Sequence, residues 1–119
     1  MKSLILPLIL LATVRTFAQD TISTKQVNQY MDKDVILKGR IINIKDYQTS
    51  KGDKMVFIDI DEKYPSNPIS IKIFEEVLLQ LKPSIYSFLN KQVYIKGKIT
   101  TYRNNPSLEL KNPKFIMLL

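Results

Sequence analysis

The chain of 119 residues contains neither cysteine nor histidine. Without cysteine it can form no disulfide and no thiolate metal site, and it has no sulfur nucleophile. Without histidine it lacks the side chain most used as a general base at neutral pH, which is also the commonest metal ligand. These absences exclude serine triads, cysteine nucleophiles and histidine-dependent metal hydrolases. We therefore expect a protein that binds rather than catalyses and that carries no cofactor.

Long hydrophobic runs are also scarce, and the longest lies at the N-terminus. Lys2 precedes an apolar stretch from Leu4 to Val14, and small residues flank Phe17 in Thr16-Phe17-Ala18. This order is typical of a secretory signal. A retained membrane anchor is the alternative, but the run contains Pro7 and falls well short of the roughly 20 residues that span a bilayer. We predict a signal peptide over residues 1–18 with cleavage near Ala18, one domain over 19–119, and a periplasmic or secreted location.

Positive charge exceeds negative charge. The chain has 18 basic and 11 acidic residues and a formal net charge of +7. Removal of Lys2 and Arg15 with the signal leaves 16 basic against 11 acidic residues, which is a net charge of +5. Such an excess favours anionic partners, but it is equally ordinary for a soluble domain that must avoid self-association.

Only three glycines are present, and two of them stand in similar segments. Residues 35–44 read VILKGRIINI and residues 93–102 read VYIKGKITTY. Apolar alternation predicts strands over 35–46, 55–61, 69–74 and 92–102, with a fifth around Leu108 and Leu110. Helical spacing predicts a short helix over 24–31, opened by a capping box. It also predicts a short turn over 75–81 and a second helix over about 83–90, divided at Pro83 because proline is tolerated in the first turn of a helix. The two glycine segments have different neighbours, so an internal duplication is not the explanation.

This order of elements, with a helix between the third and fourth strands, is that of an OB-type barrel, in which the first and fourth strands close the ring. Glycine at the bend of each closing strand suits the strong coiling of a small barrel. The motifs also resemble the small secreted bacterial OB-fold domains of the nucleic-acid-binding, tRNA-anticodon-like superfamily. The segments that carry the resemblance are Tyr30 to Ile41, Lys63-Tyr64-Pro65, Lys91 to Ile99, Tyr102-Arg103 and Pro106 to Leu110.

The resemblance covers about residues 24–118. It implies a mostly β protein: a five-stranded Greek-key barrel of the OB type, with a helix between strands three and four and a short N-terminal helix. It implies the ligand only loosely, because members of this superfamily bind single-stranded nucleic acid, oligosaccharides, cations or other proteins.

OB domains bind ligands on the outer face of the second and third strands and with the loops that join strands one to two and four to five. Aromatic rings there can stack on bases while cations pair with phosphates. Partial burial of Phe57 under a loop, and ordinary amphipathic roles for the two tyrosines, are the alternatives. The predicted nucleic-acid-binding residues are Phe57, Lys72, Tyr47, Lys54, Tyr102 and Arg103.

Two further sets of charged residues are weaker candidates for a binding site. Lys38, Arg40, Lys96 and Lys98 form either a basic stripe along the closing strands or a solvated face that prevents edge aggregation. Asp59, Asp61 and Glu62 lack the spacing of a calcium loop, so we predict no metal site. An OB-fold nuclease would need convergent carboxylates with a metal and arginines for the phosphate charge. Only Arg40 and Arg103 would remain after signal cleavage, so we do not predict a nuclease.

The sequence thus predicts an exported, non-catalytic module that binds single-stranded nucleic acid without strong sequence preference. The alternative is a periplasmic interaction module that recognises an envelope glycan or a protein partner.

Overall fold

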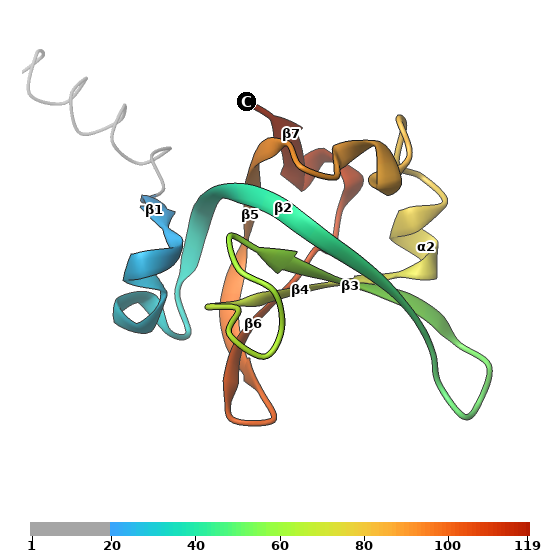
Figure 1. Ribbon diagram of the computed structural model, residues 1–119, viewed down its shortest axis with the longest axis horizontal. Helices are drawn as coiled ribbons and strands as arrows, with labels where there is room; N and C mark the ends of the chain where they lie inside the picture. Colours follow the sequence, from blue (N-terminus) through green and yellow to red (C-terminus); the bar gives the residue numbers. More distant parts are fainter. Residues whose placement is uncertain (1–19) are drawn as a thin grey trace, which may run out of the picture.

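The computed structural model of the protein describes residues 20–119. Seven strands and four short helical segments follow one another along this part of the chain (Figure 1). The strands are β1 (Thr21–Ser23), β2 (Asp34–Gln48), β3 (Lys54–Ile60), β4 (Ser70–Phe74), β5 (Gln92–Tyr102), β6 (Asn105–Glu109) and β7 (Ile116–Leu118). The helical segments are the 3-10 turn η2 (Thr24–Tyr30), the α-helix α2 (Glu75–Leu78), and the 3-10 turns η3 (Ile85–Phe88) and η4 (Pro113–Phe115).

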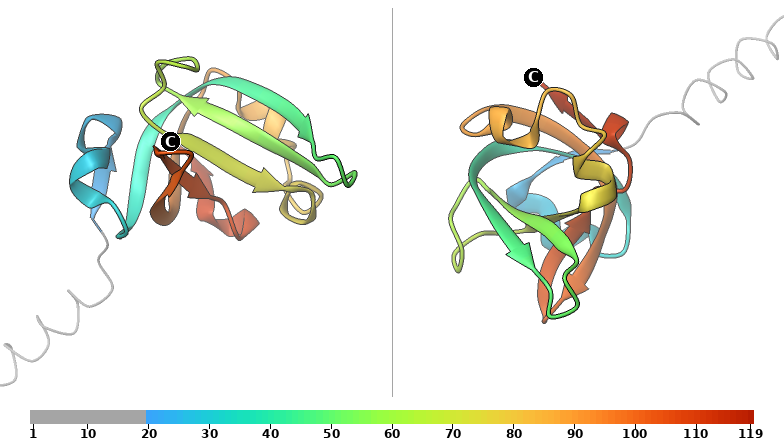
Figure 2. Two further views of the ribbon diagram at one scale, coloured as in Figure 1. Left: turned by 90° about the horizontal axis from the view of Figure 1, so that it is seen from below. Right: turned by 90° about the vertical axis from the view of Figure 1, so that its right-hand side faces the viewer.

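Five of the strands pair in a closed ring. β2 pairs with β3, β3 with β4, β6 with β5, and β5 with β2, all antiparallel, while β4 and β6 are parallel. The strands therefore curl around one interior, as the two views of Figure 2 show. β1 joins β2 in parallel and β7 joins β5 antiparallel, so both short strands lie outside the ring.

The five predicted strands are present, but the prediction of five strands in all is wrong. The first predicted strand extends to Gln48, and β1 and β7 lie where no strand was predicted. β1 and β7 have three residues each. A segment of that length shows no clear alternation of apolar and polar residues, so only the pairing partner reveals it as a strand.

The helices differ from the expectation in type and length. The segment after Ser23 begins as predicted, and the Gln26 side chain accepts a hydrogen bond from the Ser23 backbone N–H at 3.0 Å, but it is a 3-10 turn. No single helix spans 83–90. Between β4 and β5 lie the four-residue α2 and the 3-10 turn η3, on opposite sides of Pro83. Proline restricts the residue before it to extended conformations, which keeps the two segments separate.

Gly39 and Gly97 both lie on the pair of strands that closes the ring, opposite Val93 and Val35 respectively. A Cβ atom at Gly39 would lie 2.3 Å from Ile60 Cγ2, and one at Gly97 would lie 2.7 Å from Leu108 Cδ2. Each glycine therefore leaves space for a core side chain from another strand of the ring. β2 has a register irregularity between Ile41 and Asn43, where it leaves β5 to pair with β3.

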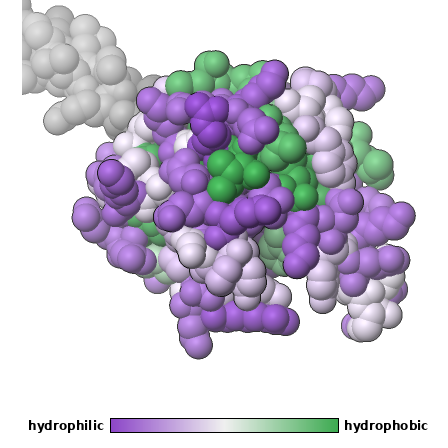
Figure 3. All heavy atoms as spheres, viewed as in Figure 1, coloured by the Kyte–Doolittle hydropathy of each residue, from purple (hydrophilic) through white to green (hydrophobic). Residues whose placement is uncertain are grey.

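The interior is filled by aliphatic side chains that alternate along the strands. Ile58, Ile71, Ile95 and Leu108 are fully buried. Val27 of η2 and Phe88 of η3 belong to the same buried cluster, so these turns cover parts of the core that the sheet leaves open. On the face viewed in Figure 3, hydrophilic side chains surround a central apolar area.

Candidate functional site

The strand register brings side chains of β2, β3 and β4 into rows on the outer surface of the sheet. Lys45 lies opposite Phe57, and Phe57 lies opposite Lys72. Because side chains alternate between the two faces of a strand, the residues two positions away form parallel rows. One neighbouring row consists of Tyr47, Met55 and Phe74, and the other of Asn43, Asp59 and Ser70.

Three aromatic rings from three strands meet on this surface, which we call the aromatic face: Tyr47, Phe57 and Tyr102. The centroid of the Phe57 ring lies 5.9 Å from that of Tyr47, at an interplanar angle of 68°. It lies 6.2 Å from that of Tyr102, at an angle of 35°. Tyr47 is 47% exposed and Tyr102 is 40% exposed, whereas Phe57 is half-buried between them. The Phe57 ring is thus packed against two neighbouring rings but still reaches the surface.

Two of the predicted cations lie on these rings. Lys72 Nζ is 5.1 Å from the centroid of Tyr102 and 5.3 Å from that of Phe74. Arg103 Cζ is 5.3 Å from the centroid of Tyr102. These distances are within the range of cation–π attraction, which keeps a positive charge beside an aromatic ring. Arg103 and Asn104 have positive φ angles of 51° and 67°, so the tight turn between β5 and β6 presents the guanidinium next to Tyr102.

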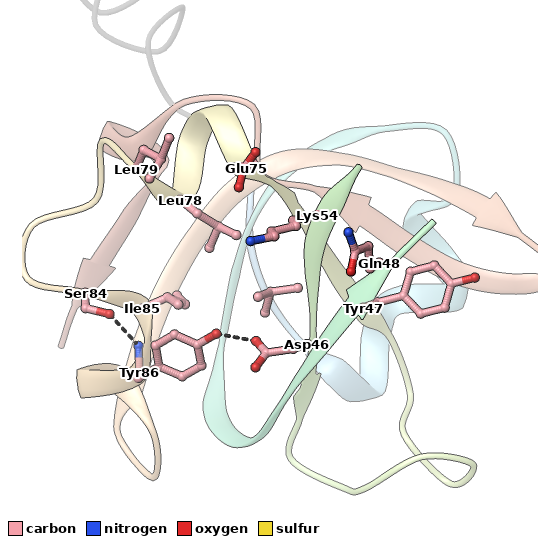
Figure 4. A pocket seen from close by; sticks show the side chains of 11 residues that line it. Asp46, Tyr47, Gln48, Lys54, Glu75, Leu78, Leu79, Ser84, Ile85 and Tyr86 are labelled. Carbon is pink, nitrogen blue, oxygen red and sulfur yellow. Dashed lines mark hydrogen bonds between the residues drawn. The ribbon is translucent and has the colours of Figure 1, made fainter. Parts of the chain in front are cut away.

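Lys54 does not join the other predicted residues. It is the first residue of β3 and shares the orientation of the inward-pointing Val56, with which it lines a separate hollow (Figure 4). This hollow has a volume of about 580 Å³ and lies between the β2–β3 hairpin and the segment that contains α2 and η3. Five of the six predicted residues are therefore gathered on one surface, and Lys54 faces the hollow, which Tyr47 also lines.

The hollow contains a contact between elements distant in the sequence. The phenol of Tyr86 donates a hydrogen bond to Asp46 Oδ1 (Figure 4). This bond, helped by burial and by the negative charge of Asp46, raises the pKa of Tyr86 above its ordinary value of 10.0. The contact ties η3 to the outer end of β2.

Sequence reasoning missed Lys45 and Phe74. Lys45 is exposed directly opposite Phe57, and Phe74 lies beneath the Lys72 ammonium. The spacing in the sequence could have identified both residues, because Lys45 stands two residues before Tyr47 and Phe74 stands two residues after Lys72. Residues two apart on a strand share a face.

The four basic residues of the closing strands share the other outer face of β2 and β5. Lys38 lies opposite Tyr94, and Lys96 lies opposite Ile36. All four basic side chains are exposed, and Lys96 Nζ lies 4.9 Å from the centroid of Phe115. These four residues lie outside the rows of the aromatic face, on the paired part of β2 and β5, and they are Lys38, Arg40, Lys96 and Lys98.

Asp61 joins two segments of the chain through its carboxylate. Asp61 Oδ1 accepts from the Arg40 N–H at 2.9 Å, and its Oδ2 accepts from Thr24 Oγ1 at 2.6 Å. Within residues 20–119, no group of three potential ligands is placed to hold a metal ion. Nor does this part of the chain contain a helix long and apolar enough to cross a membrane.

Comparison with solved structures finds a similar fold in a chain of the crystal structure of yeast Stn1 and Ten1, with a TM-score of 0.62 and 11% sequence identity. The match covers 87% of this chain and 64% of that chain, so the protein spans less than two thirds of its neighbour's length. No protein-family model and no curated protein matches the sequence. At such low identity the likeness concerns the fold alone. Together with the closed ring of strands, it identifies a mostly β protein with an OB-type fold.

Proposed function

We propose that the protein is an exported OB-type binding module that takes single-stranded nucleic acid on the aromatic face and performs no catalysis. The observation that carries this proposal is the meeting of three rings from three strands with Lys72 and Arg103 beside them. We further propose that the protein is one of the small secreted bacterial OB-fold domains that its sequence resembles. The expected signal peptide over 1–18 lies outside the described residues and remains a prediction.

The chemistry of the aromatic face suits a flexible polyanion with flat bases. A base stacked on an aromatic side chain contributes about 1 to 3 kcal/mol to binding, whatever its identity. Lys45 and Lys72 flank Phe57 in its row, and Arg103 lies next to Tyr102. A strand whose bases stack on the rings would find three cations for its phosphates. A duplex could meet the cations but not the rings, because its bases are already stacked on one another.

An envelope glycan or a protein partner is the second candidate. Exposed tyrosines suit a sugar ring or an apolar partner as well as a base. The two candidates differ in charge. Nucleic acid must release counterions when it binds, and a neutral glycan does not.

A retention assay of the protein beginning at Gln19 separates them. Single-stranded DNA, duplex DNA and a panel of neutral glycans are tested over a salt series. We expect retention of the single strand, weaker retention of duplex, and a log-log salt slope of roughly −2 if three phosphates are neutralised, at about −0.7 each. Salt-independent retention of a glycan, or no retention of the single strand at low salt, would contradict the proposal.

A further inference from the structure

A row of polar side chains lies next to Phe57. Asn43, Asp59 and Ser70 are cross-strand neighbours on β2, β3 and β4. Asp59 follows Phe57 by two residues on the same face, which corresponds to roughly 6 to 7 Å along the strand. Asp59 is only 6% exposed. A carboxylate is seldom buried to that degree without a specific set of partners.

The partners of Asp59 occupy one of its two oxygens. Oδ2 accepts hydrogen bonds from Asn43 Nδ2 at 3.2 Å and from the Tyr64 backbone N–H at 3.1 Å. Oδ1 accepts none from residues 20–119. In that part of the chain no enclosed side-chain nitrogen or oxygen lacks a partner, so Oδ1 keeps contact with solvent. The carboxylate is thus fixed through one oxygen and leaves the other as an oriented acceptor.

The two neighbours in the row add one acceptor and one donor. Asn43 uses its Nδ2 on Asp59, which leaves its Oδ1 as an acceptor. Ser70 Oγ accepts from Asn67 Nδ2 at 2.7 Å, so its hydroxyl hydrogen is available to donate. The row therefore offers two acceptors and one donor beside the central ring of the aromatic face.

We propose that this row recognises guanine, so that a base stacked on Phe57 is bound more tightly when it is guanine. This inference rests on the proposed function and adds a base preference to it. The pairing edge of guanine carries two adjacent donors, N1–H and N2–H, beside the acceptor O6, and no other common base has two ring-edge donors next to one acceptor. Asp59 and Asn43 accept from the two donors while Ser70 donates to O6.

The charge of Asp59 decides which part of the ligand meets the row. A carboxylate repels phosphate, so the backbone of the strand follows Lys45 and Lys72, and only a base edge approaches Asp59. Hydrogen bonds to an ionised acceptor are roughly twice as strong as those between neutral groups. The role of Asp59 in tying the β3–β4 loop through the Tyr64 N–H involves Oδ2 alone and leaves Oδ1 unexplained.

The first test changes only the ligand. Hexathymidylates labelled with a fluorophore carry guanine, adenine, cytosine or hypoxanthine in place of one central thymine, and binding is followed by fluorescence anisotropy. We expect guanine to raise affinity over thymine by about 5- to 150-fold, the range for one good bidentate base contact. Hypoxanthine lacks the N2 amine, so the probe that carries it should bind about fivefold or more weakly than the guanine probe.

The second test changes the protein. Asp59→Asn can keep an oxygen for Asn43 and the Tyr64 N–H, but it places an amide donor where Oδ1 was. The preference for guanine over thymine should fall below about threefold. Asp34→Asn is the control, because it makes the same change in charge at an exposed position on the other outer face of β2. It should raise the affinity for every probe alike.

The outcomes separate the inference from the proposed function. Equal affinity for all five probes overturns guanine recognition and leaves base stacking in place. A guanine preference that survives in folded Asp59→Asn overturns the role of the row. Absence of binding to every probe at low salt overturns both proposals. Because the first test uses the parent protein, a variant that fails to fold does not prevent a decision.

Discussion

Phe57 lies at the centre of the aromatic face because three separate alignments converge on it. Its position on β3 points it outward, between Lys45 and Lys72 in the register of the neighbouring strands. The β5–β6 hairpin then brings Tyr102 within 6.2 Å of it. A single side chain thus joins the contributions of β2, β4 and the hairpin.

Substitution of this ring tests the stacking role directly. Phe57→Ala should weaken the binding of a single strand by about 1 to 3 kcal/mol, because one base loses its partner. The salt dependence of binding should stay nearly unchanged, since no cation is removed. Titrations of the parent and the variant across a salt series measure both quantities, with circular dichroism as the check on folding. A basic protein that binds nucleic acid only through its net charge would show the salt dependence and no effect of the substitution.

Lys72 of β4 and Lys54 of β3 form a matched pair for a charge test, because their side chains lie on opposite faces of the sheet. Lys72→Ala should flatten the log-log salt slope by about 0.7, because one phosphate contact is lost. Lys54→Ala removes the same charge from the hollow beside Val56 and should leave the slope as it is. Equal flattening in both variants would mean that overall charge, and not the aromatic face, governs binding.

Tyr86 provides a prediction about pH. Its pKa is raised because the neutral phenol donates a hydrogen bond to Asp46. The stabilisation is complete below the unfolded pKa, near 10.0, and is lost as the pH rises through the higher folded pKa. The difference in unfolding free energy between the parent and Tyr86→Phe should therefore be constant at neutral pH and shrink above about pH 10. Denaturant unfolding at several pH values measures it, and a pH-independent difference would contradict the assignment.

At the scale of the strands, β2 and β5 depend on the two glycines of the closing pair. Gly97→Val would bring a branched side chain against Leu108, and Gly39→Val would bring one against Ile60. Since both neighbours are fully buried, we expect a loss of about 1 to 3 kcal/mol in each variant from strain and overpacking.

Thermal and denaturant unfolding measure the cost of each glycine substitution. Lys98→Val is the control, because it places the same side chain at the exposed neighbouring position of β5. It should change the stability by less than about 0.5 kcal/mol. Glycine variants as stable as the parent would show that the ring tolerates a side chain at these positions.

For the whole molecule, the prediction concerns processing. The order of Lys2, the apolar run and Thr16-Phe17-Ala18 predicts export with cleavage near Ala18. Expression of the full chain in a bacterium with a periplasm, followed by intact-mass measurement of the periplasmic fraction, should give a protein beginning at Gln19. Recovery of the uncleaved chain from the cytoplasm would contradict it.

The amino-acid sequence by itself determined the features that depend on near neighbours in the chain. Alternation of apolar residues located the five ring strands, and the similar segments around Gly39 and Gly97 identified the two that close the ring. The outward position of Phe57 followed from the same alternation. Such patterns can be read from the sequence because each ring strand has at least five residues, which is long enough to show the alternation.

Only the tertiary structure decided what lies beside what. Lys54 belongs to β3 and not to the preceding loop, and this extension of the strand by one residue turns it to the side opposite Phe57. The contact of Tyr86 with Asp46 and the row of Asn43, Asp59 and Ser70 join segments far apart in the chain. Register and the close approach of strands arise from packing of the whole interior, and no short window of sequence contains that information.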